Sequence, residues 1–193
     1  MTEHFNDLMR EIEEFGRNND SIYSEKESRM RNIAKTTGQF LGMLLELSNS
    51  RRVLEIGTSN GYSTLWLAKS LKKLNGTVTT IEYLESKAEL ASKNFNRSGF
   101  ADVIDLVHGD GGAYLASTES NSFDFILLDS DRKEYVTWWE DLVRVIKPGG
   151  MIVMDNAVSH QSELTDFLSL VSNSDGCESV LLPFDSGVLL IKF

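Results

Sequence analysis

The chain has 193 residues, of which 41% are hydrophobic, and 29 acidic against 19 basic residues give it a net charge of −10. This length predicts a single domain, residues 1–193, and the acidic balance argues against a nucleic-acid substrate, which would require a basic face. The single cysteine, Cys177, excludes an internal disulfide and fits a reducing compartment. No apolar run is long enough to span a membrane, so we expect a soluble, cytoplasmic protein with no membrane partner.

Residues 1–48 predict helices that precede a core over residues 49–193. The first helix has one apolar face, formed by Phe5, Leu8, Met9, Ile12 and Phe15. Ser24 to Glu27 form a capping box, which predicts a second helix through about Lys35. The apolar positions of a third helix are Phe40, Leu41, Leu44, Leu45 and Leu47. These helices can pack on the core, on a partner subunit, or on both.

From Arg52 the chain alternates strands and helices. Strands are predicted at residues 53–56, 77–81, 103–107, 123–128 and 151–154. The inward positions of the intervening helices are Leu67, Leu71, Leu74; Leu84, Ala88, Ala91, Phe95; Tyr135, Trp138, Leu142, Val145; and Leu164, Phe167, Leu168, Val171. Gly99 predicts a helix end, and Lys147 to Gly150 predict a hard turn. A hairpin of residues 179–184 and 188–193 closes the chain, which favours a mostly parallel sheet with one antiparallel strand at or near its edge.

The first predicted strand of the core runs into a turn with two glycines, Gly57 and Gly61, and a helix follows. This order is typical of a nucleotide-cofactor cradle, although glycine turns also close strands for steric reasons alone. Glu55 argues against a dinucleotide-binding turn of the GxGxxG kind, because a carboxylate there would repel the pyrophosphate that such a turn holds. It would suit a cationic group instead.

The stretch from Glu55 to Ser63, Glu-x-Gly-Thr-x-x-Gly-Tyr-Ser, resembles motif I of the class I S-adenosylmethionine-dependent methyltransferases. More narrowly, it resembles the O-methyltransferase family that contains the catechol and caffeoyl-CoA O-methyltransferases. The resemblance covers about residues 36–193. It implies a Rossmann-like, seven-stranded α/β sheet, mostly parallel, with a C-terminal antiparallel hairpin and helices on both faces. It also implies S-adenosylmethionine as the cofactor, a homodimer, and amino-terminal helices that help to roof the substrate site.

The resemblance also implies which residues hold the cofactor. Glu82 would accept hydrogen bonds from the ribose, Tyr83 would lie against the adenine and Asp110 would face its edge; an exposed strand-end charge and an ordinary Gly-Asp-Gly turn are the alternatives. Ser63 and the backbone near Thr58 and Ser59 would hold the methionine carboxylate. The full predicted cofactor set is Glu55, Gly57, Thr58, Ser59, Gly61, Tyr62, Ser63, Glu82, Tyr83, Asp110, Gly111 and Asp129.

Acidic and amide residues end two strands that are predicted to be parallel neighbours. Asp129 follows one strand, and Asp155 and Asn156 follow the next. Two carboxylates and an amide oxygen form a hard oxygen set that suits Mg²⁺, Mn²⁺ or Ca²⁺. These residues match the metal triad of the resembled family residue for residue. Turn and helix-cap chemistry is the alternative explanation.

The implied reaction is metal-assisted transfer of a methyl group to a hydroxyl of a small, catechol-like acceptor, with Asp129, Arg132 and Lys133 as catalytic candidates. The family often has lysine where Arg132 stands, and arginine cannot accept a proton. Either Arg132 stabilises the oxyanion while the metal acidifies the hydroxyl, which we favour, or Lys133 takes the base role. The loop 157–163 is too short for the substrate loop of the plant and animal enzymes, and His160 is expected on the rim of the site.

Other functions remain open at this point. A methyltransferase that uses no metal and acts on another small nucleophile would keep the cofactor residues. A non-catalytic S-adenosylmethionine-binding or interaction protein would bind its partner through the amino-terminal helices. A nicotinamide dehydrogenase is the most distant alternative.

Overall fold

The computed structural model describes residues 2–193. The seven α-helices of this range are α1 (Thr2–Ile22), α2 (Lys35–Ser48), α3 (Tyr62–Leu74), α4 (Glu85–Ser98), α5 (Gly111–Ser117), α6 (Tyr135–Val145) and α7 (Thr165–Ser172). The strands are β1 (Arg52–Ile56), β2 (Thr77–Glu82), β3 (Ile104–His108), β4 (Phe123–Leu128), β5 (Ile146–Met154), β6 (Glu178–Leu182) and β7 (Val188–Lys192). Short 3₁₀ turns lie at Ala101–Val103, Arg132–Glu134 and Gln161–Glu163.

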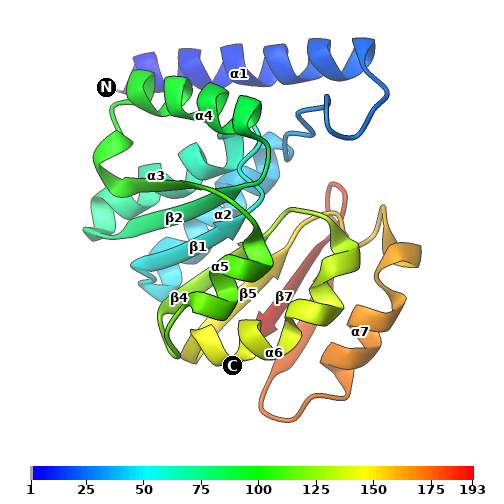
Figure 1. Ribbon diagram of the computed structural model, residues 1–193. Coiled ribbons are helices and arrows are strands. Elements are labelled where there is room, and N and C mark those ends of the chain that lie inside the picture. The colour runs from blue at the N-terminus through cyan, green and yellow to red at the C-terminus, as the bar shows by residue number, and fades with distance from the viewer. Residues whose placement is uncertain (1) are drawn as a thin grey trace.

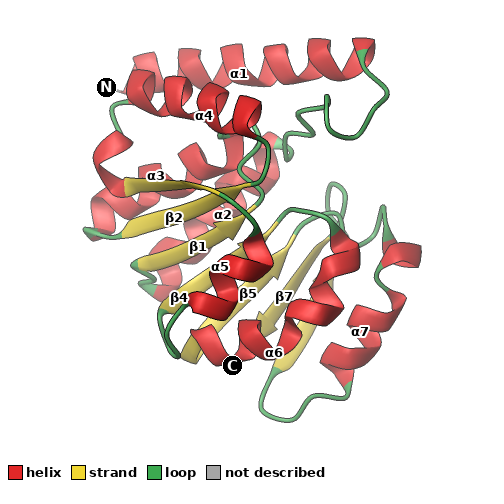
Figure 2. Cartoon of the chain, viewed as in Figure 1, coloured by secondary structure: helices red, strands yellow, loops and turns green. Residues whose placement is uncertain are grey.

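The strands form one seven-stranded sheet in the order β3-β2-β1-β4-β5-β7-β6. Strands β1 to β5 pair in parallel, whereas β7 is antiparallel to both β5 and β6 (Figure 2). The predicted fold class is therefore confirmed, including the C-terminal hairpin. Parallel neighbours require crossover connections, and the helices that make them cover the sheet.

Two hydrophobic cores lie on opposite faces of this sheet. Val53 and Leu127 face the core that contains α1 to α4, whereas their chain neighbours Leu54 and Ile126 face α5, α6 and α7. Helix α1 lies along α4, far from it in sequence (Figure 1). Since both faces are covered, the central strands are apolar on both sides, as parallel strands usually are. No helix within residues 2–193 is both long and apolar enough to cross a membrane.

The predicted second helix is wrong. Ser24 to Glu27 lie in a turn, residues 29–34 have no regular structure, and the next helix begins only at Lys35. The carboxylate of Asp20 accepts the backbone N–H groups of Met30, at 2.6 Å, and Arg31, at 2.8 Å, and Arg31 has a φ of 52°. A left-handed residue with its N–H bonded to a distant side chain cannot continue a right-handed helix.

Other local predictions also need correction. The expected hard turn at residues 147–150 lies within β5, where Gly149 has a φ of 81° and the pairing with β4 shifts register between Phe123 and Phe125, as in a β-bulge. Helix α5 was not predicted. Phe15, predicted on the inward face of α1, is 46% exposed, whereas its neighbour Gly16 is buried against Asn32. On α6 the residue Trp139 is more deeply buried than Trp138.

Candidate functional site

The candidate site lies at the carboxyl ends of β1, β2, β4 and β5, where the turns after these strands meet. Gly57 has a φ of 109°, and a side chain there would place its Cβ 2.2 Å from the backbone oxygen of Asp129. The N–H of Gly57 donates to the oxygen of Ile81 at 3.0 Å, and the N–H of Asp129 donates to that of Ile56, also at 3.0 Å. The glycine turn and Asp129 are therefore held against each other, and only glycine fits this approach.

Glu55 is completely buried below this turn. Its carboxylate accepts hydrogen bonds from three hydroxyl groups, those of Ser63 at 2.5 Å, Thr80 at 2.6 Å and Thr64. Burial raises the pKa of Glu55 to about 7, although these hydroxyl groups act in the opposite direction. Both carboxylate oxygens thus have protein partners, and the predicted contact of Glu55 with a cationic ligand group stays a prediction.

Glu82 is buried at the end of β2 and fastens the glycine turn to it. One carboxylate oxygen accepts the N–H of Ser59 at 2.7 Å, and the other accepts the N–H of Leu84 at 2.9 Å. Ser59 has a φ of 50°, so this bond holds it in a conformation that serine rarely adopts. Each carboxylate oxygen still has a second lone pair with which it can accept a ribose hydroxyl.

The remaining cofactor candidates lie around this turn or along the same edge. Gly61 packs on Phe95, and the hydroxyl of Thr58 bonds that of Thr80 at 2.6 Å. Tyr62 is buried and points its hydroxyl toward Glu13 on α1, at 3.3 Å.

The candidates for the adenine end lie at the ends of β2 and β3. Tyr83 is 71% exposed. Asp110 caps α5 by accepting the N–H of Ala113 at 2.8 Å, which is the turn-type role that the sequence left open. Gly111 is buried against Ile56.

Asp129 and Asp155 follow neighbouring parallel strands, since Leu128 pairs with Met154. Burial raises the pKa of Asp129 well above its usual range, and the charge of Asp155 acts in the same direction. Burial likewise raises the pKa of Asp155 to about 6. The Oδ1 atom of Asp155 is buried without a hydrogen-bond partner in the described chain, whereas Oδ2 accepts the amide N–H of Asn156 at 2.9 Å. The structure therefore brings the predicted triad together and leaves an acceptor oxygen unsatisfied there.

Arg132 is buried beside these carboxylates. Its positive charge opposes the rise in the pKa of Asp129 and of Asp155 but does not cancel it. Arg132 forms an ion pair with Glu163, at 3.8 Å. Its Nε atom and the hydroxyl of Ser130 have no hydrogen-bond partner among the described residues. Lys133, in contrast, is exposed on the outer side of the 3₁₀ turn. The two basic candidates therefore differ in position: Arg132 is buried and its charge acts on Asp129 and Asp155, whereas Lys133 is exposed.

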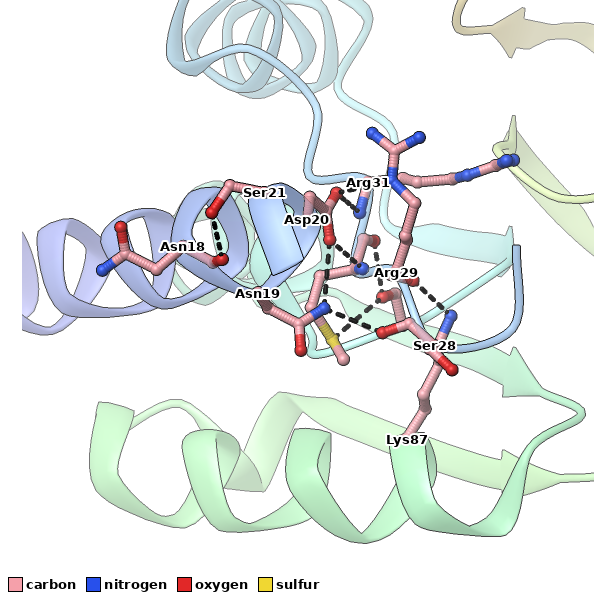
Figure 3. Close-up of polar contacts among 10 residues, drawn as sticks. Asn18, Asn19, Asp20, Ser21, Ser28, Arg29, Arg31 and Lys87 are labelled. Carbon is pink, nitrogen blue, oxygen red and sulfur yellow. Dashed lines mark hydrogen bonds and ion pairs between the residues drawn. The ribbon is translucent and has the colours of Figure 1, made fainter. Parts of the chain in front are cut away.

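The segment 23–34 lies against the turns after β1 and β4, and we call this side of the candidate site its mouth. The resemblance implied that amino-terminal helices help to roof the site, but this segment contains no helix. The oxygen of Met30 accepts the hydroxyl of Ser59 at 2.7 Å, and Lys26 pairs with Asp131 at 2.7 Å. Lys87 on α4 donates to the oxygen of Arg29 at 2.7 Å, and Figure 3 shows this contact near the end of α1. The segment is thus fixed to the turns after β1 and β4 at once.

His160 lies near the mouth, half-buried, with its Nδ1 2.8 Å from the hydroxyl of Ser159. Burial lowers its pKa, and the charges of Arg132, Arg31 and Lys26 act in the same direction. Within residues 2–193 no three His, Cys, Asp or Glu side chains are grouped so that they could hold a metal ion. The predicted triad differs from such a group because its third member is an amide.

An open, mostly parallel sheet with acidic strand ends around a glycine turn defines a small-molecule-binding α/β protein of the Rossmann type. A family model described as O-methyltransferase matches residues 6–167. The chain therefore belongs to this O-methyltransferase family, and the resemblance inferred from Glu55 to Ser63 is confirmed.

Three similar proteins illustrate the relationship. The catechol O-methyltransferase of Niastella koreensis is 34% identical over 65% of this chain and 58% of its own length. Caffeoyl-CoA O-methyltransferase 2 of Zea mays is 34% identical over 89% of this chain and 79% of its own length. A crystal structure of a cofactor-bound protein from MTB superimposes with a TM-score of 0.79 at 26% identity, covering 90% of this chain and 85% of that one. The chain spans somewhat more than half the length of the first curated relatives that it matches.

Proposed function

We propose that this protein is an S-adenosylmethionine-dependent O-methyltransferase that uses a divalent cation and methylates a hydroxyl of a small acceptor with two adjacent oxygens. One observation carries the proposal: the half-buried Asp129 and the buried Asp155 follow neighbouring strands at the glycine turn, and the Oδ1 atom of Asp155 has no partner in the described chain. Two neighbouring carboxylates withdrawn from water in this way are costly without a compensating cation. The relatives named as catechol and caffeoyl-CoA O-methyltransferases support the same reaction.

The residues present fit both groups. Asp129, Asp155 and Asn156 would hold the cation through oxygen atoms, with Asn156 turning its amide oxygen inward, and Glu82 would accept ribose hydroxyls. When bound, the cation would lower the pKa of an acceptor hydroxyl, and S-adenosylmethionine would supply the methyl group. Arg132 would then stabilise the acceptor oxyanion, since a guanidinium cannot serve as the base. The exposed position of Lys133 speaks against a direct role for it.

A metal-independent methyltransferase is the second candidate, and Arg132 is the observation that favours it. Its buried guanidinium already places one positive charge beside Asp129 and Asp155. The amide N–H of Asn156 also donates to Asp155, which is the opposite of a metal-ligand orientation. In that case Arg132 alone would hold the acceptor anion.

Titration calorimetry of Mg²⁺, Mn²⁺ and Ca²⁺ into protein loaded with S-adenosylhomocysteine separates the two candidates. We expect one site in the wild-type protein and at least a roughly tenfold weaker site in Asp155→Ala, because one of two carboxylate ligands is lost. Asp166→Ala, an exposed aspartate of α7, is the matched control.

The same protein samples are then assayed for methyl transfer to catechol, with and without a chelator. If methyl transfer continues in the presence of the chelator, and calorimetry detects no metal binding to the wild-type protein, the metal-assisted mechanism is refuted. The metal-independent methyltransferase then remains. Failure to load S-adenosylhomocysteine would refute the proposed cofactor.

A further inference from the structure

Arg31 occupies a defined position at the mouth of the candidate site. Its chain neighbour Met30 is fixed to Ser59 of the glycine turn, and Lys26 of the same segment is fixed to Asp131 beyond β4. The charge of Arg31 acts on Asp129 and on His160, which face the mouth from two other loops. Its charge also acts on Lys87 of α4, so the guanidinium lies within electrostatic reach of the loops after β4 and β5 and of α4.

The backbone of Arg31 is held in an unfavourable conformation. Its φ of 52° lies in the left-handed region, which is unfavourable for a residue with a side chain. Asp20 compensates by accepting the N–H groups of both Arg31 and Met30, and Figure 3 shows Asp20 at the end of α1 facing these residues. Strained positions that the surrounding structure enforces are frequent at ligand-binding sites.

The side chain of Arg31 differs from those of the other cations of the segment, because it has no partner among the described residues. Lys26 pairs with Asp131, and Arg29 approaches Asp20 at 3.7 Å. Within residues 2–193 no hydrogen bond or ion pair involves the side chain of Arg31, which is exposed. The guanidinium of Arg31 is therefore available to bind an anionic ligand group.

We propose that Arg31 binds a carboxylate of the methyl acceptor and thereby selects hydroxylated acids over neutral acceptors. Under the proposed function, the cation on Asp129 and Asp155 would bind the two adjacent hydroxyl oxygens at the inner end of the site, and Arg31 would bind the carboxylate at the mouth, so the acceptor enters with its hydroxyl oxygens inward. Arginine suits this role because its planar fork binds a carboxylate through two parallel hydrogen bonds. This inference rests on the proposed function.

The test compares 3,4-dihydroxybenzoate with 3,4-dihydroxybenzamide, which have nearly the same shape but differ in charge. We expect wild-type kcat/KM to favour the acid by about tenfold or more, as a hydrogen bond to a charged group does. Arg31→Gln should bring the ratio to about one and leave the value for the amide within about twofold. Arg17→Gln, which removes an exposed charge on α1, should keep the wild-type ratio.

Calorimetric binding of the same two compounds to protein loaded with S-adenosylhomocysteine provides a readout without turnover. A binding preference that Arg31→Gln abolishes, in a protein that methylates neither compound, would support this inference and refute the proposed function. A ratio unchanged by Arg31→Gln would overturn the inference. The inference would also be overturned if Arg31→Gln bound S-adenosylhomocysteine more weakly while the acid-to-amide ratio of kcat/KM stayed unchanged. Arg31 would then bind the carboxylate of the cofactor.

Discussion

Glu55 is a carboxylic acid buried in the middle of the molecule, and its partners are three hydroxyl groups rather than a cation. Hydroxyl donors stabilise the ionised form, but the loss of hydration outweighs them, and the pKa rises to about 7. The folded state therefore holds a proton on Glu55 over a pH range in which the unfolded chain has lost it. This residue couples the stability of the glycine turn to pH.

The contribution of Glu55 to stability should fall as the pH rises. Its folded pKa of about 7 exceeds the unfolded value of 4.5, so its contribution is complete below about pH 4.5 and is lost as the pH passes 7. Between these limits we expect Glu55→Gln to gain roughly 3 kcal/mol in free energy of unfolding relative to the wild-type protein. Urea denaturation at pH 4.5, 6 and 8 measures this difference.

Glu119→Gln, an exposed site before β4, is the control for this series and should show no such trend. A constant difference between Glu55→Gln and the wild-type protein across the three pH values would mean that Glu55 is ionised throughout. The hydroxyl network would then outweigh its burial.

At the scale of an element, the segment 23–34 depends on bonds to other parts of the chain because it has no regular structure of its own. Asp20 supplies two of these bonds, to Met30 and Arg31. Although burial acts in the opposite direction, the hydrogen bonds to Asp20 lower its pKa below the usual 3.8. The carboxylate should therefore hold the segment at every pH above about 4, and release it only in stronger acid.

Asp20→Ala should release this segment without unfolding the sheet. The loss of charged hydrogen bonds should cost about 1.5–3 kcal/mol. Limited trypsin digestion should then cut faster after Lys26, Arg29 or Arg31, and mass spectrometry of the fragments locates the cuts. Asp7→Ala, which removes a surface ion pair of α1 with Arg10, is the control. Equal cleavage rates in the wild-type protein and Asp20→Ala would show that the other bonds suffice.

At the scale of the whole molecule, α1 connects the segment 23–34 to α3 and α4, on which α1 packs. The ring of Phe5 contacts Trp66 on α3 edge-on, at 6.0 Å between centroids, and Phe100 at 5.3 Å. Glu11 pairs with Arg97 on α4 at 2.5 Å. Since Asp20 lies at the other end of the same helix, the docking of α1 also positions the segment over the site.

Phe5→Ala should destabilise the protein by about 3–5 kcal/mol, because it removes a buried aromatic ring. Phe15→Ala, on the same helix but 46% exposed, should change the free energy of unfolding by less than about 0.5 kcal/mol. Denaturant titration of both variants tests this contrast. Similar losses in the two variants would mean that α1 packs along its whole length.

The sequence by itself determined the order and kind of nearly all elements from β1 onward. Hydrophobic period and turn residues are local signals, and in a sheet covered on both faces local and tertiary preferences agree. The acidic strand ends could be predicted to meet for the same reason: in parallel strands, topology alone puts the residues after Leu128 and Met154 side by side.

Only the tertiary structure decided the residues whose conformation depends on distant partners. The capping box at Ser24 was overridden by Asp20, which takes N–H groups that a helix would have used. Glu55 and Glu82 were predicted as ligand contacts, and only the folded structure shows that donors from other elements also bond to their carboxylate oxygens. Arg31 stands at the mouth because α1 folds back along α4. No pattern within twenty residues encodes such a meeting, since it forms only when the whole sheet and its helices have packed.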